Sequence, residues 1–281
     1  MVSDLPTILT ATGADQPGLT AAITGAVTKA GGNIIELGQQ TDPYVRRYGC
    51  RLAITGLVDL ERLRQDLRQL SVEFGISWEL HDPALRQRVV IACSSALHCV
   101  TDLVGRIETG DLRCDLAGVV SDKDAVGALC ARLGIPFAHV PVGEDRAAQE
   151  LAFSEAVGSH GPDLVVLARY MRILPAWVTQ EHAGRMINIH HSTLPAFPGA
   201  NPRRRAHERG VKIVGATAHY VTADLDEGPI IDQDVIRIGN HTLAETIQLG
   251  EEVERLVLAR AIRLHLDHRV MVFGERTCVF S

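Results

Sequence analysis

The chain has 281 residues and a net charge of −6, with 46% hydrophobic and 22% charged residues. This composition supports one large or two ordinary globular domains with a buried core. The acidic balance argues against a nucleic-acid partner, which requires a basic face, and no apolar run approaches the roughly 20 residues that span a bilayer. We therefore expect neither a nucleic acid nor a membrane as partner.

The cysteines indicate a reducing compartment. There is no Cys-x-x-Cys pair, so the sequence offers neither a zinc knuckle nor a thioredoxin motif. Met1–Pro6 has no basic or apolar leader pattern, and reduced thiols are typical of chains without one. We expect a cytoplasmic protein. The six cysteines are Cys50, Cys93, Cys99, Cys114, Cys130 and Cys278.

Residues 1–82 alternate in the order strand, helix, strand, strand, helix, strand. Asp15 is expected to cap the first helix and Gly31 to end it, and Asp59–Phe74 has the apolar spacing of the second. This order is the βαββαβ pattern of a ferredoxin-like domain. The predicted strands are Leu5–Ala11, Asn33–Gln39, Arg47–Thr55 and Ile76–Leu80.

A polar linker is expected at residues 83–87, and residues 88–281 form the second predicted domain. Its short apolar runs have helical stretches between them, as in a parallel sheet that is buried on both faces. Asp122 is expected to cap one of these helices. The pattern predicts a doubly wound α/β domain that binds its ligand at the carboxyl ends of the strands. The runs are Val89–Cys93, Leu116–Val120, Phe137–Val142 and Leu164–Ala168.

The chain ends with a long helix and a hairpin. Thr242 and Glu245 have the spacing of a capping box, and apolar positions recur after them through Leu264. Arg269–Phe273 and Arg276–Phe280 flank Gly274, which predicts a final hairpin.

The segment Met186–Pro198, MINIHHSTLPAFP, carries the first candidate residues. Side chains alternate along a strand, so Asn188 and His190 are expected on the same face of a strand end. An amide donor beside an imidazole suits acyl chemistry, because the pair can stabilise an oxyanion and move a proton. The same pair would also fit two capping side chains, and residue type and spacing leave both readings open.

The segment Gly215–Gln233 carries a further candidate catalytic residue, Asp226. Gly228 and Pro229 force a turn, which places Asp226 on a loop after a strand. A loop carboxylate beside a His–Asn pair could hold the imidazole and orient water. A solvated acidic turn is the alternative reading.

These segments resemble the folate-dependent formyltransferase family, which has an Asn-x-His at a strand end and an Asp on a later loop. The resemblance assigns Asn188, His190 and Asp226 as catalytic residues. Leu167–Leu174, LARYMRIL, resembles the family segment whose backbone holds the pterin. The folate contacts that the resemblance implies are Arg172, Ile173, Leu174, His219 and Gly228.

Over about residues 7–280 the chain resembles most closely the formyltetrahydrofolate deformylase family, and its TATGADQPGLTAAI and GGNI segments resemble an ACT regulatory domain. That family hydrolyses 10-formyltetrahydrofolate to formate and tetrahydrofolate, which supplies formate for purine biosynthesis and balances the one-carbon folate pool. The resemblance implies that Asp226 activates water through His190, and that Asn188 and His190 hold the oxyanion. It implies neither metal nor cofactor.

The ACT resemblance also implies partners. It predicts a homodimer or homotetramer held partly by residues 1–82. A small amino acid is the expected effector, bound near Asp15, Gly18 and Leu19.

Two departures keep another activity open. Thr193 stands where the family usually has an aromatic residue, and Arg203, Arg204 and Arg205 could bind an anionic acceptor or form a solvated helix face. The alternative is an N-formyltransferase that delivers the formyl group to a small amine. A different class of protein, an amino-acid sensor with an inactive second domain, is disfavoured by the retained catalytic residues.

Overall fold

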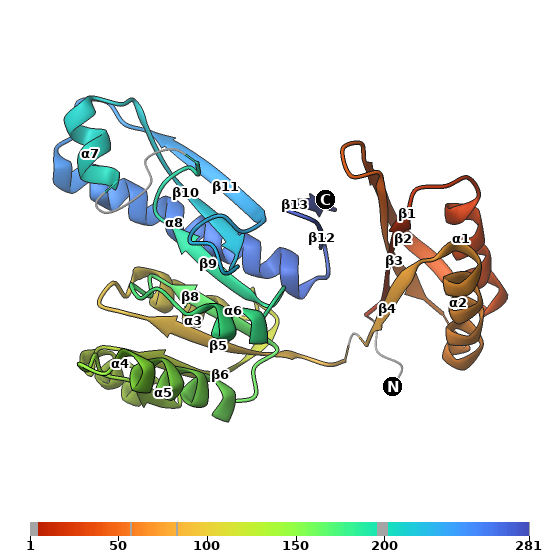
Figure 1. Ribbon diagram of the computed structural model, residues 1–281, viewed down its shortest axis with the longest axis horizontal. Coiled ribbons are helices and arrows are strands. Elements are labelled where there is room, and N and C mark those ends of the chain that lie inside the picture. Colours follow the sequence, from red (N-terminus) through yellow and green to blue (C-terminus); the bar gives the residue numbers. More distant parts are fainter. Residues whose placement is uncertain (1–4, 57, 83, 196–201, 281) are drawn as a thin grey trace. The chain divides into compact units, whose positions relative to one another are not determined.

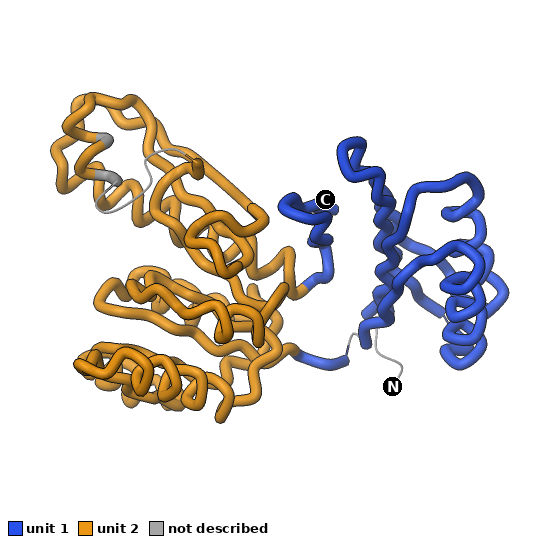
Figure 2. The backbone as a smooth tube through the Cα atoms, in the orientation of Figure 1, with its two compact units in different colours: residues 1–86, 267–281 blue, residues 87–266 orange. Residues whose placement is uncertain are grey.

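The computed structural model describes residues 5–56, 58–82, 84–195 and 202–280. The chain divides into two compact units, residues 1–86 with 267–281 and residues 87–266 (Figure 2).

Unit 1 is an antiparallel four-stranded sheet with strand order β2-β3-β1-β4. The helices α1 and α2 pack together on one face of this sheet (Figure 1), around a core of aliphatic residues such as Leu52 and Leu67. The predicted βαββαβ order is confirmed. The elements are β1 (Thr7–Ala14), α1 (Leu19–Lys29), β2 (Asn33–Asp42), β3 (Arg47–Thr55), α2 (Leu60–Phe74) and β4 (Ser77–His81).

The expected cap of α1 was wrong. Gly18, not Asp15, occupies the N-cap position, and no side chain accepts a hydrogen bond there. Gly18 has φ of 87°, a left-handed conformation that side chains with a Cβ rarely adopt. The backbone therefore enters α1 through a glycine turn, which leaves the Asp15 carboxylate on the surface.

The C-terminal hairpin, β12 (Val270–Phe273) and β13 (Arg276–Val279), confirms the predicted one. It packs on the β-sheet face opposite α1 and α2. Added Cβ atoms on Gly38 and Gly49 would lie only 2.8 Å from Phe280 and 2.6 Å from Phe273, so these glycines make room for the rings. Residues 267–281 thus group with unit 1, whereas the sequence placed them in a domain spanning 88–281.

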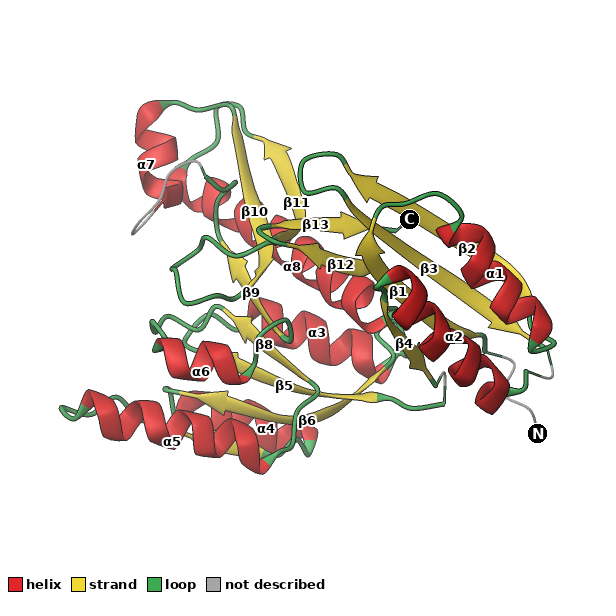
Figure 3. Cartoon of the chain, turned by 45° about the vertical axis from the view of Figure 1, so that its right-hand side comes forward, coloured by secondary structure: helices red, strands yellow, loops and turns green. Residues whose placement is uncertain are grey.

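Unit 2 contains a seven-stranded sheet with strand order β11-β10-β9-β8-β5-β6-β7 and helices on both faces (Figure 3). Strands β5 to β9 run parallel, and β10 and β11 are antiparallel additions at one edge. The predicted doubly wound, mostly parallel sheet is confirmed. The strands are β5 (Gln87–Cys93), β6 (Cys114–Ser121), β7 (Phe137–His139), β8 (Leu164–Ala168), β9 (Met186–His190), β10 (Ile213–Tyr220) and β11 (Ile230–Arg237).

Of the two helix caps predicted in unit 2, the structure confirms one and contradicts the other. Thr242 and Glu245 form the expected capping box, with each backbone N–H donating to the other side chain. Asp122 caps nothing; Asp124 holds the N-cap position of α4, and Asp122 pairs with Arg172 instead. The helices are α3 (His98–Glu108), α4 (Ala125–Leu133), α5 (Arg146–Ser159), α6 (Ala176–Glu181), α7 (Pro202–Arg209) and α8 (Leu243–Leu266).

Within the described part of the chain, no helix combines the length and the apolar character needed to cross a membrane.

Candidate active site

Two neighbouring strands and one loop bring the candidate catalytic residues together. Asn188 on β9 lies directly opposite His219 on β10, and His190 is the last residue of β9. Asp226 follows β10 on a loop and has φ of 58°, a left-handed conformation that Asp tolerates better than most residues. The expectation that Asn188 and His190 share a face is met, because both side chains approach Asp226.

The Asp226 carboxylate is the centre of this group. Its Oδ2 lies 3.1 Å from His190 Nδ1, and its Oδ1 lies 3.5 Å from Asn188 Nδ2 and 3.6 Å from His219 Nε2. A carboxylate only accepts hydrogen bonds, so the proton between Asp226 and His190 belongs to Nδ1 of the imidazole. His190 therefore directs its Nε2 away from Asp226.

The Asp226 carboxyl stays ionised through the neutral range. Burial alone would raise the pKa of Asp226, but the hydrogen bond from His190 outweighs it and holds this pKa well below its usual range. An ionised carboxylate beside an imidazole is the arrangement of a general base with its orienting group.

His219 orients the amide of Asn188. Its Nδ1 lies 2.9 Å from the backbone oxygen of Tyr220, which only accepts, so Nδ1 carries the proton. Its Nε2 then accepts from Asn188 Nδ2 at 3.1 Å. The second hydrogen of the Asn188 amide is left with only the long contact to Asp226, and it is available to an oxygen of a substrate.

One nitrogen of the group has no partner. His190 is 5% exposed, and its Nε2 is buried without a hydrogen bond from any described residue. A buried polar atom of this kind calls for an explanation, and a substrate atom that binds there is one.

A cavity of about 390 Å³ contains the group. Asn188, His190, His219 and Asp226 line one part of it, and the predicted pterin segment lines another. Of the predicted folate contacts, Arg172, Ile173, Leu174 and His219 are therefore in the cavity wall.

Gly228 does not line this cavity. A Cβ added to Gly228 would lie 1.8 Å from the backbone oxygen of Tyr220, which leaves no room for any side chain. The next residue, Pro229, accepts a hydrogen bond from the Tyr220 N–H at 2.9 Å. Gly228 thus permits a close backbone crossing that fixes the loop carrying Asp226.

The segment after β8 is anchored from two sides. The Ser94 N–H donates to the Arg169 oxygen at 3.2 Å, and the Met171 N–H donates to Ser94 Oγ at 3.1 Å. The Arg172 guanidinium donates to Asp122 Oδ2 from Nε at 3.2 Å and from Nη2 at 3.1 Å. Burial alone would raise the pKa of Asp122, but hydrogen bonds from Ser94 and Arg172 lower it below its usual range.

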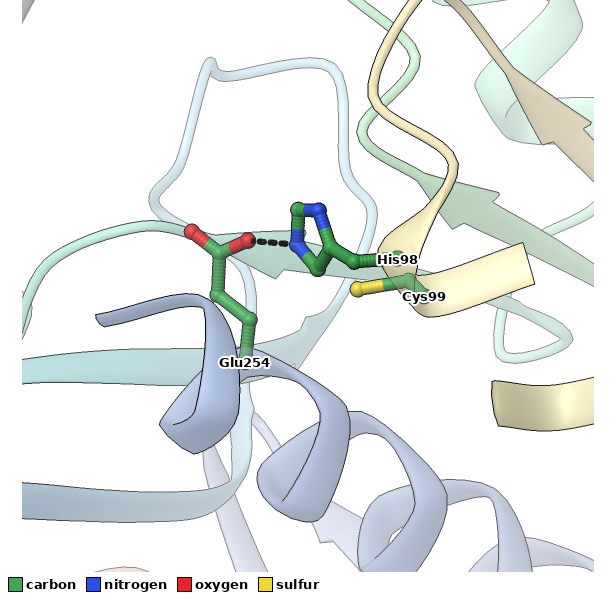
Figure 4. A group of neighbouring side chains, drawn as sticks. All are labelled: His98, Cys99 and Glu254. Atoms are coloured by element: carbon green, nitrogen blue, oxygen red, sulfur yellow. Dashed lines mark hydrogen bonds and ion pairs between the residues drawn. The ribbon is translucent and has the colours of Figure 1, made fainter. Parts of the chain in front are cut away.

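Sequence reasoning missed a buried ionic cluster (Figure 4), which adjoins the cavity through Arg169. His98 and Cys99 come from α3 and Glu254 from α8; His98 Nε2 donates to Glu254 Oε2 at 2.6 Å. Glu254 is fully buried, and Arg169 Nη1 lies 3.6 Å from its other oxygen. A sequence signal existed, since Glu254 occupies an apolar position between Val253 and Val257 of an amphipathic helix.

The same cluster offers metal-ligand atoms. One nitrogen of His98, the Cys99 sulfur and one Glu254 oxygen lie within 4.8 Å of one another. The Arg169 cation next to the same carboxylate opposes a metal ion there. Burial also raises the pKa of the Cys99 thiol, which disfavours the thiolate that a metal requires.

Thr193 and Arg204, which depart from the family pattern, are not among the described residues that line the cavity. Thr193 follows β9, and a Cβ added to Gly215 would lie 2.6 Å from its methyl carbon, so Thr193 packs against β10. Arg204 on α7 pairs with Glu208 at 2.8 Å, and both side chains are more than half exposed. This exposure favours the solvated-face reading for Arg204.

Unit 1 has a cavity of its own, of about 320 Å³. Asp15, Gly18 and Leu19, the residues predicted for an effector, all line it. Thr20 joins two further lining side chains, donating to Gln39 at 2.6 Å and lying 3.0 Å from the hydroxyl of Tyr48.

Comparison with known proteins places each unit. The formyl transferase family model matches residues 87–262 and the ACT domain model matches residues 6–81. A formyltetrahydrofolate deformylase from Bacillus subtilis is 42% identical over 95% of this chain and 91% of its own length. One from Escherichia coli is 40% identical over 94% of this chain and 95% of its own length.

Solved structures agree with these sequence matches. The crystal structure of a formyltetrahydrofolate deformylase from Pseudomonas syringae superposes with a TM-score of 0.95 at 38% identity, covering 100% of this chain and 96% of that chain. A glycinamide ribonucleotide transformylase from Symbiobacterium toebii gives a TM-score of 0.66 at 32% identity, covering 70% of this chain and 95% of that one.

Proposed function

Since the chain belongs to the formyltetrahydrofolate deformylase family, we propose that Asn188, His190 and Asp226 carry out its reaction in the 390 Å³ cavity. The chain is a hydrolase that converts 10-formyltetrahydrofolate to formate and tetrahydrofolate. The observation that supports these three residues is their mutual geometry: each side chain reaches Asp226 or is Asp226, and all line one cavity.

Water is the acceptor in the proposed reaction. Asp226 and His190 orient a water molecule and take its proton as its oxygen attacks the formyl carbon. His190 in its protonated form and the second hydrogen of the Asn188 amide, which exchanges its long contact with Asp226, donate to the resulting oxyanion. The C–N bond then breaks, the departing nitrogen takes this proton, and the resulting formic acid loses its O–H proton to solvent as formate and tetrahydrofolate leave.

The folate is proposed to lie along the segment after β8. Arg172, Ile173 and Leu174 line the cavity, and the bonds from Ser94 and Asp122 hold this segment in place. His219 is proposed to act from the wall by orienting Asn188, and Gly228 by fixing the loop of Asp226.

The alternative, transfer of the formyl group to a small amine, is not favoured. The relatives that match nearly the whole chain are deformylases, whereas the glycinamide ribonucleotide transformylase matches 70% of it. An isotope experiment tests water as acceptor directly. Hydrolysis in ¹⁸O-labelled water should place one ¹⁸O atom in each formate, as read by mass spectrometry, and unlabelled formate would exclude attack by water.

Unit 1 is proposed to regulate this activity. A small amino acid fits the chemistry of the 320 Å³ cavity, where the Asp15 carboxylate can pair with an ammonium group and the Gln39 amide can bind a carboxylate. Such an effector changes the rate only if it binds two states of the enzyme differently.

We also propose a homodimer or homotetramer held by unit 1. A rate screen with the twenty amino acids and light scattering test these two proposals.

We further propose a cytoplasmic location and hydrolysis without a metal or cofactor. The six cysteines are all buried, and no disulfide joins any of them, which suits a reducing compartment. The reaction needs only a base, an oxyanion site and water, and protein side chains supply the first two.

A further inference from the structure

Arg169 is a charged residue of the cavity wall that the proposed mechanism does not use. It follows β8 directly, has φ of 63° and lines the same cavity as Asn188 and Asp226. A residue with a Cβ pays for this left-handed backbone in strain, and such strain clusters at functional sites. The side chain is only 17% exposed, and its Nε and Nη1 atoms are buried without a hydrogen bond among the described residues.

Glu254 lies near the Arg169 guanidinium and helps to position it, but the two do not form a close salt bridge. The carboxylate is fully buried, and its short bond of 2.6 Å goes to His98, not to Arg169. Arg169 Nη1 stays at 3.6 Å, beyond hydrogen-bond distance from Glu254 Oε1. Buried ion pairs add little stability on balance, so a loosely paired one at a catalytic cavity points to a role in the reaction.

The reaction creates an anion that this cavity must accommodate. Hydrolysis rests here on the function proposed above, and it releases formate beside Asp226, which stays ionised. Two carboxylates at such close range repel one another, and the repulsion is strong where water is excluded. A cation at the cavity wall offsets this repulsion.

Of the arginines in the described lining of the cavity, Arg169 is the one suited to this task. Arg172 already makes two hydrogen bonds to Asp122, at 3.2 and 3.1 Å, and these hold the folate segment. In the part of the chain that the structure describes, Nε and Nη1 of Arg169 donate no such short bond to a carboxylate partner. A guanidinium binds a carboxylate through two parallel N–H donors, a geometry that formate fits.

We propose that Arg169, positioned by the Glu254–His98 pair, is the binding site for the formate product. The site takes small carboxylates, draws formate away from Asp226 and acts after the C–N bond has broken. It changes neither the bond that breaks nor the path of the proton.

Formate as a product inhibitor tests this site. Replacing Arg169 alone would remove the cation beside the buried Glu254 carboxylate, and breaking a buried ion pair in this way destabilises proteins by roughly 3–5 kcal/mol. We therefore compare two variants. Glu254→Gln keeps the Arg169 charge, whereas the double variant Arg169→Gln/Glu254→Gln removes both charges of the pair. Arg106→Gln is the matched control, because Arg106 pairs with Asp102 and Asp111 on the surface of α3, outside the cavity lining.

We expect formate to inhibit the wild type, Glu254→Gln and Arg106→Gln with inhibition constants within about threefold of one another. In the double variant the constant should rise at least tenfold, with potassium chloride of equal ionic strength as the salt control. An unchanged constant in the double variant would overturn the proposal. So would a tenfold loss in Glu254→Gln, because the Gln oxygen can still accept from His98, and the loss would then depend on the Glu254 charge and not on the Arg169 cation.

A binding measurement separates this proposal from the proposed function. Line broadening of ¹³C-formate by the resting enzyme needs no turnover. If wild-type enzyme binds formate and the double variant does not, the site stands even where hydrolysis fails. If the wild type hydrolyses its substrate but binds formate no better than the double variant does, Arg169 is not the formate site. The proposed hydrolysis is unaffected by that result.

Discussion

His190 Nδ1 lies 3.1 Å from Asp226 Oδ2, and this contact joins the end of β9 to the loop after β10. It fixes the proton on Nδ1 and leaves the buried Nε2 without a hydrogen bond among the described residues, in a side chain that lines the cavity. The predictions below start from this pair.

Asp226→Asn should keep substrate binding and lose turnover. The amide has nearly the same shape but cannot take a proton or hold a protonated His190, and a general base typically contributes 10²–10⁴-fold to the rate. We expect kcat to fall by about that factor, with a Kd for the folate within about threefold of wild type, measured by stopped-flow and fluorescence titration. Glu227→Gln, the exposed neighbour on the same loop, is the control and should retain full activity. If both variants lost kcat equally, the total negative charge of the loop would matter and the position of the Asp226 carboxylate would not.

Gly228→Ala should disrupt the site although it adds one methyl group. Its Cβ would lie 1.8 Å from the Tyr220 oxygen, a backbone atom that cannot yield without moving the loop. We expect a loss of roughly 1–3 kcal/mol in unfolding free energy and a large loss of activity. Gly158→Ala near the end of α5 is the matched control, because nothing lies within 4 Å of its added Cβ, and it should be neutral or slightly stabilising. A fully active, stable Gly228→Ala enzyme would contradict this role for the crossing.

His265 should make the stability of the protein sensitive to mild acid. Burial lowers the pKa of His265 from 6.5 to about 4, and its Nδ1 lies 2.8 Å from the Tyr220 hydroxyl. The unfolded chain takes up the proton near pH 6.5 and the folded chain only near pH 4, so stability is full above pH 6.5 and falls as the pH drops between these values.

A fully buried ring would lose about 3 kcal/mol over that range. Because His265 keeps some exposed surface, we expect about 1–2 kcal/mol. Urea unfolding at pH 6.5 and pH 4.5 should show this loss in wild type and in His241→Gln, an exposed control, but a smaller one in His265→Gln. An identical pH profile in His265→Gln would show that other groups cause the acid sensitivity.

Chelation should leave the activity unchanged. The His98–Cys99–Glu254 group has ligand atoms for a metal, but Arg169 already supplies its positive charge. After dialysis against EDTA we expect formate release within about 20% of the untreated rate, with metal analysis of the same sample. Lost activity that returns on adding zinc would place a metal in this cluster instead.

The sequence predicted the arrangement of the candidate site residues where local rules apply. Asn188 and His190 alternate along one strand, which places them on one face, and the Gly228–Pro229 turn places Asp226 on a loop. That the loop returns to Asn188 and His190 was given by family resemblance, since no local rule relates β9 to the loop after β10. The doubly wound order followed from apolar runs of strand length.

Long-range packing is what the sequence did not predict. The apolar position of Glu254 in α8 signals its burial, but not its contact with Arg169, which depends on a left-handed residue at the end of β8 and on the approach of α8. The hairpin at residues 267–280 was predicted as an element, but its packing on the sheet of unit 1 depends on Gly38 and Gly49, which lack side chains and therefore give no apolar pattern.

Formate release without an amine tests the central claim most directly. Enzyme and a large excess of 10-formyltetrahydrofolate are mixed with no other acceptor, and formate and tetrahydrofolate are measured over many turnovers. We predict steady release of both products in a one-to-one ratio, continuing well beyond one equivalent of enzyme. A formyl group that stays on the folate until an amine is added would contradict the assignment of this site to hydrolysis.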